Sequence, residues 1–185
     1  MRTADCLKQL AEHRTDEIVL SAMTSATIWP DLSDHPRDLI YVPSTMGGAS
    51  ALAMGLAIAK PGIRVITLNG DGCQLMSLGS MVTIGEQAPE NYALVVFDNG
   101  IYAVTGGQSL PGAGQVDFAG IAQAANWRAV HVIASLDEWT AVIPAILTEP
   151  GPVFIHAKVT PEPTSIGPHP VPIPERLETL RKALK

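Results

Sequence analysis

Short apolar runs alternate with amphipathic stretches along the chain. The first amphipathic stretch, residues 3–13, places Ala4, Leu7, Leu10 and Ala11 on one face of a predicted helix. Buried strands are predicted at residues 18–20, 39–42, 63–68, 92–97, 127–133 and 152–158. Further helices are predicted from the segment 43–48 to residue 60, and at residues 74–87, 117–125, 135–147 and 176–185. Because continuous apolar strands separated by helices are typical of parallel sheets covered on both faces, we expect a three-layer α/β fold with a mostly parallel sheet.

The pattern contains no internal repeat and no linker that would divide two domains. We therefore predict one domain over residues 1–185, a length that allows a sizeable core. Its Pro-rich C-terminal tail, residues 161–185, is predicted to be extended before the last helix. Residues 103–116 are rich in glycine and are predicted to form a functional loop.

Composition and charge exclude several classes of function. Charged residues make up 16% of the chain and hydrophobic residues 46%, and the net charge of −6 argues against nucleic acid or an anionic membrane as a partner. Cys6 and Cys73 lie too far apart in sequence for a CxxC zinc motif, and a disulfide framework is less expected still. The N-terminus does not resemble a signal peptide, and the longest apolar stretch, residues 49–59, is too short to span a bilayer. We expect a soluble cytoplasmic protein.

Candidate chemistry lies in the loops that follow the predicted strands, because ligands of parallel sheets bind outside the carboxyl ends of the strands. These loops are residues 22–25, 43–48, 69–73 and 98–108. Two of them form a spaced pair, Gly70-Asp71-Gly72 and Asp98-Asn99-Gly100, with one helix and one strand between them. We expect this spacing to bring Asp71 and Asn99 to the same edge of the sheet.

A carboxylate and an amide on neighbouring strand ends offer two hard oxygen ligands. Mg²⁺ prefers oxygen ligands and usually takes one or two carboxylates, with phosphates among the others. The glycines allow backbone N–H groups to approach a diphosphate, and the positive end of the helix predicted after Gly72 points toward the same anion. The pair therefore predicts a magnesium–diphosphate site.

These residues resemble the signature of enzymes that depend on thiamine diphosphate, a GDG triplet followed by an NN pair. Here the 25 residues 73–97 separate the triplet from Asp98-Asn99, and Asp98 stands where the family has its first asparagine. The resemblance implies thiamine diphosphate and Mg²⁺ as cofactors. It implies Asp71, Asn99 and the backbone carbonyl of Ile101 as metal ligands.

Other segments resemble the cofactor contacts of the same family. Met23-Thr24-Ser25 stands where a loop touches the diphosphate, and Pro43-Ser44-Thr45-Met46-Gly47 resembles the segment beneath the bend of the cofactor. There Met46 is implied to wedge between the two rings, and the Ser44 carbonyl to accept a hydrogen bond from the 4′-amino group. The cofactor-binding residues that the resemblance implies are Thr24, Ser25, Ser44, Met46, Gly70, Gly72, Cys73 and Thr105.

The segment Thr105-Gly106-Gly107-Gln108 is similar to the TGGQ segment of sulfopyruvate and phosphonopyruvate decarboxylases. In that group the diphosphate-binding half can be a separate small beta subunit, whose length this chain matches. The resemblance implies a carbon–carbon lyase that decarboxylates a sulfopyruvate- or phosphonopyruvate-like 2-oxo acid, with Gln108 on the substrate side.

Such enzymes need a glutamate that shares a proton with the pyrimidine ring, and it belongs to a different, pyrimidine-binding domain. No motif that resembles that site surrounds Glu12, Glu17, Glu86, Glu90 or Glu138. No catalytic residue is therefore assigned to this chain. The resemblance implies a separate pyrimidine-binding, alpha-type subunit as partner, in a heterotetramer or larger assembly.

Ordinary structural interpretations stand beside these assignments. Asp71 and Asn99 are residue types that favour turns at strand ends whatever the function. Met46 is equally at home in a core, Thr24 and Ser25 can cap the helix that follows them, and the glycine-rich loop can be a mobile lid. Cys73 has no visible activating base, so we interpret it as a buried, unreactive thiol.

Three other functions compete with decarboxylation. A carboligase would keep thiamine chemistry and change the acceptor, and a regulatory subunit would keep the fold and cofactor without turnover. A nucleotide-binding Rossmann domain requires GxGxxG after the first strand, where this chain has Ala22-Met23-Thr24-Ser25.

Overall fold

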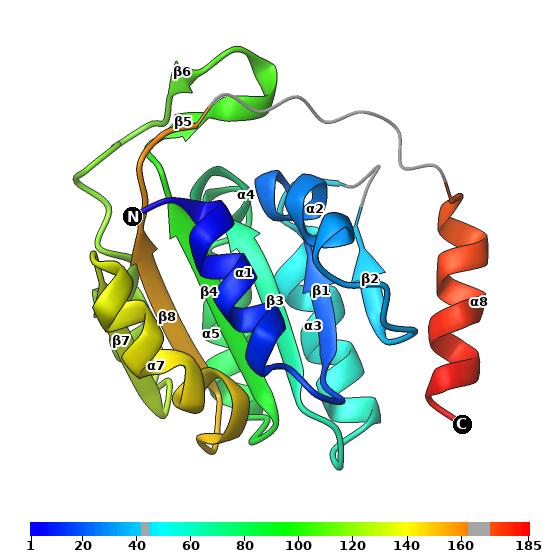
Figure 1. The fold of residues 1–185 in the computed structure, drawn as a ribbon. Coiled ribbons are helices and arrows are strands. Elements are labelled where there is room, and N and C mark those ends of the chain that lie inside the picture. Colours follow the sequence, from blue (N-terminus) through cyan, green and yellow to red (C-terminus); the bar gives the residue numbers. More distant parts are fainter. Residues whose placement is uncertain (42–44, 163–170) are drawn as a thin grey trace.

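A parallel six-stranded sheet forms the centre of the computed structural model, which describes residues 1–41, 45–162 and 171–185 (Figure 1). Its strand order is β2-β1-β3-β4-β8-β7, and every pair of neighbours is parallel. The strands are β1 (Ile18–Ser21), β2 (Asp38–Ile40), β3 (Val65–Gly70), β4 (Tyr92–Asp98), β7 (Ala129–Ile133) and β8 (Val153–Lys158). The predicted three-layer α/β fold is therefore confirmed.

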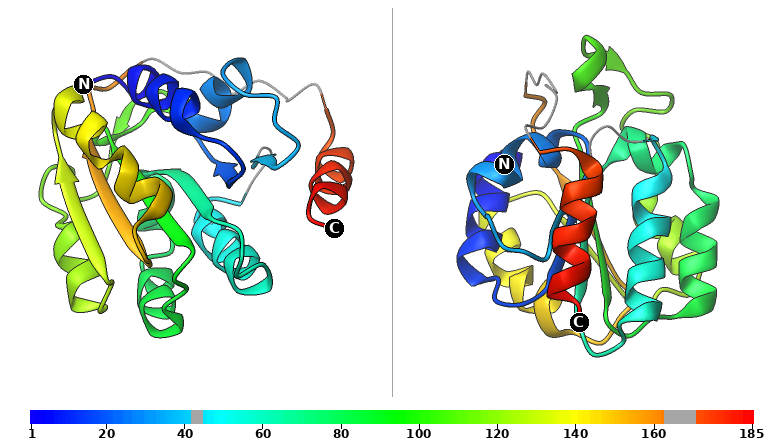
Figure 2. Two further views of the ribbon diagram at one scale, coloured as in Figure 1. Left: turned by 60° about the horizontal axis from the view of Figure 1, so that its bottom comes forward. Right: turned by 90° about the vertical axis from the view of Figure 1, so that its right-hand side faces the viewer.

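Helices cover both faces of this sheet, as the side view in Figure 2 shows. One face carries α1 (Thr3–His13), α2 (Thr24–Ile28), the 3₁₀ turn Trp29–Asp31 and α7 (Leu136–Thr148). The other face carries α3 (Gly48–Ala59), α4 (Asp71–Leu75), α5 (Gly79–Gln87) and α6 (Phe118–Ala124). In the described part of the chain, no helix has both the length and the apolar character that a bilayer crossing requires.

Two hydrophobic clusters, one on each face, hold the layers together. Successive residues of a strand point to opposite faces, so Val95 packs toward α1 and α7 while Leu94 and Val96 pack toward α3 and α5. Two buried tryptophans give their ring N–H to backbone carbonyls, Trp139 to Cys6 and Trp127 to Met81. These bonds satisfy the polar end of each indole and so offset the cost of removing its N–H group from water.

The single helix predicted at residues 74–87 is wrong, because the chain forms α4 and α5 with a break at residues 76–78. The carbonyl of Ser77 accepts hydrogen bonds from the side chains of Gln74, at 3.3 Å, and Ser80, at 2.6 Å. Such local side-chain bonds compete with the helical backbone pattern. The helix also begins at Asp71 rather than after Gly72, so Asp71 lies in its first turn.

The predicted loop 103–116 contains more regular structure than expected. Strands β5 (Ile101–Tyr102) and β6 (Gln108–Ser109) form an antiparallel hairpin around the 3₁₀ turn Ala103–Thr105. The hairpin stands above the carboxyl ends of the sheet strands (Figure 1). Its position places it over the edge at which the sequence predicts the site.

The last helix, α8 (Ile173–Ala183), lies along the β2 edge of the sheet (Figures 1 and 2). The guanidinium of Arg176 donates to the carbonyl of Ile40, and Arg37 and Lys60 donate to carbonyls at the end of the helix. Because an uncovered edge strand pairs readily with other chains, α8 protects the sheet there. Residues 163–170 of the Pro-rich tail lie outside the described residues.

Candidate functional site

The Asp71 carboxylate joins the tips of β3 and β4. It lies directly after β3, in the first turn of α4, and accepts backbone hydrogen bonds from Gly72 at 2.8 Å, Asn99 at 3.0 Å and Gly100 at 2.7 Å. Only 3% of the residue is exposed. The spacing of Gly70-Asp71-Gly72 and Asp98-Asn99-Gly100 correctly predicted that the two segments lie at one edge of the sheet. The hydrogen bonds that join them run from backbone N–H groups of the second segment to the Asp71 carboxylate.

Two opposing influences act on the acidity of this group. Burial, and after it the nearby carboxyl of Asp98, raises the pKa of Asp71 to about 7, while the backbone N–H groups of Gly100 and Gly72 act in the opposite direction. A cation bound at the carboxylate would favour its charged form. The arrangement thus places a buried acid where a positive charge is stabilising.

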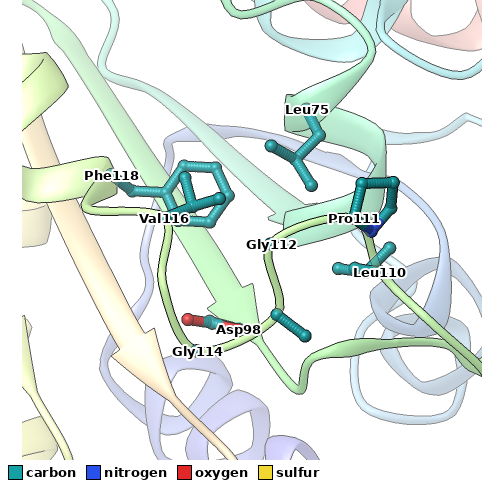
Figure 3. A pocket seen from close by; sticks show the side chains of 9 residues that line it. Leu75, Asp98, Leu110, Pro111, Gly112, Gly114, Val116 and Phe118 are labelled. Atoms are coloured by element: carbon teal, nitrogen blue, oxygen red, sulfur yellow. The ribbon is translucent and has the colours of Figure 1, made fainter.

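Asp98 is held from its other side by a histidine. The Nε2 atom of His156 lies 2.8 Å from Asp98 Oδ2, and this hydrogen bond lowers the pKa of Asp98 below its ordinary value. His156 is buried and meets the ring of Phe118 edge-on at a centroid distance of 5.5 Å. In Figure 3 the Asp98 carboxylate lies under the glycine-rich loop, in a small pocket with Leu110, Val116 and Phe118 among its lining residues.

Asn99 and Ile101 lie in a tight turn stabilised by the asparagine. The Asn99 side-chain oxygen accepts the backbone N–H of Ile101 at 3.0 Å, and Gly100 between them has a φ of 72°, a value that favours glycine. Asp71, Asn99 and Ile101 are therefore neighbours around one turn. Their roles as metal ligands stay a prediction.

Close backbone approach explains the second glycine of the triplet. A Cβ atom added to Gly72 would lie 2.7 Å from the Tyr102 ring and 2.9 Å from Leu110. The hairpin and the loop behind it therefore pack directly on the GDG backbone. Gly70 has more room, with the Met23 side chain 3.6 Å from the equivalent position.

The loop after β1 is strained at Met23. This residue has a φ of 53° and a ψ of −130°, an unusual conformation for a side chain other than glycine. Thr24 and Ser25 form the first turn of α2, whose N-cap is Met23. The interpretation that Thr24 or Ser25 caps this helix is wrong, because both lie inside it; a diphosphate contact from either stays a prediction.

The segment after β2 meets the GDG turn at Cys73. Gly47, with a φ of 90°, donates its backbone N–H to the Cys73 sulfur at 3.2 Å. Burial raises the pKa of the Cys73 thiol, in line with the interpretation of an unreactive thiol. Met46 is half-buried against the cluster around α3, and Ser44 lies outside the described residues.

Thr105 and Gln108 lie at the exposed end of the β5–β6 hairpin. The Thr105 hydroxyl donates to the Gln108 side-chain oxygen at 3.1 Å, and the Gln108 amide nitrogen donates to the Thr105 carbonyl at 2.9 Å. The two side chains therefore satisfy one another in the exposed tip. The structure places them over the site edge, away from the buried Asp71.

The residues around Asp71 fit a magnesium ion and a diphosphate. The donors available there are a buried carboxylate, an amide oxygen and a backbone carbonyl, which are the hard oxygen ligands that Mg²⁺ prefers. The GDG backbone is more open at Gly70, where the nearest side chain, Met23, lies 3.6 Å from the position that a Cβ would take, than at Gly72, where Tyr102 and Leu110 fill that space. Among the described residues, His, Cys, Asp and Glu side chains form no cluster of three that would suggest a different metal.

Sequence reasoning missed His156 and Met23. His156 is a buried polar residue directly after the apolar run 153–155 in the strand Val153–Lys158, and that anomaly was an available signal. Its partner could not be named, because the neighbour of β8 depends on the order of strands in the sheet. For Met23 the sequence carries no signal, since its residue type does not indicate a positive φ.

A family model described as "Thiamine pyrophosphate enzyme, C-terminal TPP binding domain" matches residues 22–157 of the chain. A phosphonopyruvate decarboxylase of Streptomyces viridochromogenes is 34% identical over 160 residues, which are 86% of this chain and 40% of the relative. A sulfopyruvate decarboxylase subunit beta of Methanothermobacter thermautotrophicus is 36% identical over 130 residues, which are 70% of this chain and 66% of the relative. The chain thus spans less than half of the first relative and about two thirds of the second.

Solved structures show the same fold. The crystal structure of benzoylformate decarboxylase from Polynucleobacter necessarius superposes with a TM-score of 0.70 and 23% sequence identity. The match covers 90% of this chain and 34% of the other. The fold of this chain is therefore one part of a larger architecture in that enzyme.

Proposed function

The chain belongs to the thiamine pyrophosphate enzymes, in which it matches the C-terminal cofactor-binding domain, and from this premise we propose that it binds the diphosphate and Mg²⁺ of thiamine diphosphate within a 2-oxo acid decarboxylase. The observation that carries the proposal is the buried Asp71 carboxylate, which ties the tips of β3 and β4 together. It supplies a negative charge at the strand ends, where ligands of parallel sheets bind.

The residues that would hold the metal are Asp71, Asn99 and the carbonyl of Ile101. Three backbone N–H groups fix the Asp71 carboxylate before any ligand arrives, so little reorganisation is needed on binding. The turn at Gly100 keeps Asn99 and Ile101 beside it. The metal in turn would neutralise the diphosphate, for which the backbone at Gly70 leaves more room than that at Gly72.

Thiamine diphosphate, when bound, supplies an electron sink for the carbon that loses carbon dioxide. The chain's own contribution is to bind, orient and exclude water. Met46 and Thr105 would contact the cofactor from two sides. Thr24 and Ser25 would contact its diphosphate. Tyr102 and Leu110 pack on the Gly72 backbone and shield the GDG turn from solvent.

We propose a three-carbon 2-oxo acid with a second anionic group as the substrate. Two of the related proteins are named for such acids, one for phosphonopyruvate and one for sulfopyruvate. Gln108, at the tip of the hairpin over the site, is the candidate for a substrate contact. The Gln108 side-chain nitrogen, which donates a hydrogen bond to the Thr105 carbonyl, is a suitable donor to a sulfonate or phosphonate oxygen.

The proton-sharing glutamate would come from a separate pyrimidine-binding subunit. Around the Asp71 turn the structure places the carboxyls of Asp71 and Asp98, and neither is a glutamate. A relative named as a subunit beta supports an assembly of unlike chains, for which we propose a heterotetramer or larger form. The assembly would work in the cytoplasm.

The test is to co-express the chain with the product of the adjacent reading frame and to assay the purified complex with thiamine diphosphate and Mg²⁺. A panel of 2-oxo acids should show decarboxylation of sulfopyruvate or phosphonopyruvate, with carbon dioxide and aldehyde in equal amounts. A ligated product in place of the aldehyde would indicate a carboligase. Full activity of the chain alone would refute the requirement for a partner.

A further inference from the structure

A buried histidine in β8 faces the tip of β4. His156 is 4% exposed and lies opposite Val96 in the parallel ladder that joins the two strands. Residues paired in a parallel ladder point to the same face of the sheet, and Asp98, two residues beyond Val96, points to that face too. The Nε2 atom of His156 therefore reaches the Asp98 carboxylate, where it lies 2.8 Å from Oδ2.

Packing fixes the orientation of the His156 ring. The ring of Phe118, the first residue of α6, meets it edge-on, with 5.5 Å between the centroids and 73° between the planes. An ionised carboxylate only accepts hydrogen bonds, so the histidine is the donor of this pair. β8 and α6 together thus present one N–H group to Asp98 in a set direction.

Asp98, the last residue of β4, is attached to β8 at two points. Its backbone carbonyl accepts the N–H of Val159 at 2.9 Å, and its side chain accepts the bond from His156. The first bond continues the ladder past the end of β8 and fixes the backbone of Asp98. The second bond fixes its side chain, so the turn that follows β4 begins from an anchored residue.

The two residues after Asp98 hold the Asp71 carboxylate. The N–H groups of Asn99 and Gly100 both donate to its Oδ2 atom, at 3.0 Å and 2.7 Å. Their directions depend on the backbone dihedrals at which the turn leaves β4, and a rotation there would move both donors together. The side-chain bond of His156, the turn and the two N–H bonds thus connect β8 to Asp71.

We propose that His156 is a positioning residue for the proposed metal site, which acts through Asp98 to fix the turn that orients Asp71. The proposal rests on the proposed function, because it gives the carboxylate the role of a Mg²⁺ ligand. Mg²⁺ demands near-ideal geometry of its ligands, so a small rotation of the turn lowers its affinity. Residues that orient metal ligands in this way commonly change metal affinity by about tenfold to a hundredfold when they are removed.

The alternative is a pair that only strengthens the sheet. The parallel ladder between β4 and β8 extends to Asp98 and Lys158, and it joins the strands through their backbones. Apolar residues of similar size often replace a buried ion pair without loss of stability. Strand pairing alone therefore gives no reason for a histidine at this position, whereas a donor aimed at Asp98 does.

The experiment separates the N–H donor from the bulk of the side chain. His156→Leu removes the donor and keeps an apolar side chain of similar size, and His156→Gln keeps an N–H group at a similar reach. Ile146→Val and Ile146→Ala are the controls for destabilisation, because Ile146 is fully buried in α7 on the opposite face of the sheet. Urea titration of each full-length chain shows whether the two controls bracket the loss of stability in His156→Leu.

Amide hydrogen exchange in the full-length chain without cofactor reports directly on the turn amides of Asn99 and Gly100. In His156→Leu both amides should exchange at least about tenfold faster than in either Ile146 variant, because the turn opens locally. His156→Gln should return both rates to within about threefold of the wild-type values, since the hydrogen bond to Asp98 is restored.

Calorimetry on the assembled complex, with thiamine diphosphate present, measures the affinity for Mg²⁺. His156→Leu should weaken this affinity by about tenfold or more, and His156→Gln by about threefold or less. The Ile146 variants should leave it unchanged, because the complex is folded at the temperature of the measurement. If His156 acts through Asp98, adding His156→Leu to Asp98→Ala should weaken Mg²⁺ binding no further.

Each result decides the proposal. Equal exchange of the two turn amides in His156→Leu and in the Ile146 variants would overturn it. So would a failure of His156→Gln to restore either measurement, or additive effects of Asp98→Ala and His156→Leu on Mg²⁺ affinity. Faster exchange with unchanged Mg²⁺ affinity would also overturn it, because the histidine would then support the turn without serving the metal.

Failure of the proposed function has a different signature. A wild-type complex that binds neither thiamine diphosphate nor Mg²⁺ would refute that function and, with it, a role of His156 in metal binding. Faster exchange of the turn amides in His156→Leu would still show that the histidine fixes the turn. The exchange measurement in the free chain therefore distinguishes a wrong function from a wrong assignment of His156.

Discussion

The two ends of the candidate site are built in different ways. At the proposed metal end, Asp71 is 3% exposed and fixed by three backbone N–H groups, with Asp98 and His156 behind it. At the proposed substrate end, Thr105 and Gln108 lie in an exposed hairpin tip, where their side chains bond to one another. One end is fixed before a ligand arrives, and the other can exchange its bonds for bonds to a ligand.

This contrast suggests a division of labour. A cation and a diphosphate need fixed donors, because catalysis depends on their exact placement. A substrate contact gains from a surface loop that can differ between relatives without disturbing the core. We therefore expect substitutions at the buried end to affect cofactor binding and folding, and substitution of Gln108 at the tip to affect substrate binding alone.

The largest effect is expected for Asp71→Ala. Loss of the carboxylate removes the proposed metal ligand and leaves the N–H groups of Gly72, Asn99 and Gly100 without their acceptor. Decarboxylation by the assembled complex should fall more than about a thousandfold, and magnesium-dependent binding of thiamine diphosphate, measured by calorimetry, should be lost.

Asp117→Ala is the matched control for this change. Asp117 is an exposed aspartate that accepts a backbone N–H, from Gly120, at the start of α6. Its loss should cost about 1 kcal/mol of stability and leave cofactor affinity unchanged. If Asp71→Ala binds the cofactor as tightly as Asp117→Ala does, Asp71 is not a metal ligand.

The next largest effect is expected for His156→Ala, which removes the buried histidine that pairs with the half-buried Asp98. The free energy of unfolding, measured by urea titration, should fall by about 3 kcal/mol. His131→Ala is the control, because His131 pairs with Glu149 at 3.0 Å but both side chains are more than a third exposed. That pair should contribute less than about 1 kcal/mol. Equal losses of unfolding free energy in the two variants would show that the less exposed pair of His156 and Asp98 contributes no more to stability than the more exposed pair of His131 and Glu149.

A smaller effect is expected where the two ends touch. Gly72→Ala would press a methyl group against Tyr102 and Leu110 and shift the hairpin. Cofactor affinity should fall about tenfold, since the strain costs on the order of 1–2 kcal/mol. Gly62→Ala, where a Cβ meets nothing within 4 Å, should have no effect on affinity. Unchanged affinity in both variants would mean that the hairpin moves freely over the GDG turn.

The sequence predicted the sheet and the site edge because both depend on local patterns. Apolar runs identify buried strands, and parallel connection by helices brings Gly70 and Asp98 to the same edge. The break between α4 and α5 was not predictable, because it depends on where the side chains of Gln74 and Ser80 point. A helical period alone carries no such information.

The contact between Asp98 and His156 illustrates the same limit at longer range. It requires β8 to lie next to β4, although β7 precedes β8 in the chain. Sequence order suggests β7 as the neighbour, and only the packed sheet reverses that expectation. The strained Met23 is likewise a product of packing, since its backbone conformation is imposed by the surrounding turn rather than by its residue type.

The smallest effect, and the sharpest test of the comparison, is expected for Gln108→Ala. The side chain is exposed and its hydrogen-bond partners are the hydroxyl and carbonyl of Thr105, so its loss should leave the melting temperature unchanged. If the amide contacts the substrate, KM for the 2-oxo acid should rise about threefold to tenfold, the effect of one hydrogen bond, with thiamine diphosphate affinity unaltered. The control is Gln115→Ala, because Gln115 is an exposed glutamine outside the hairpin, and it should change neither KM nor the affinity for thiamine diphosphate. A Gln108→Ala variant that loses affinity for thiamine diphosphate while KM for the 2-oxo acid is unchanged would contradict this division, because Gln108 would then contact the cofactor rather than the substrate.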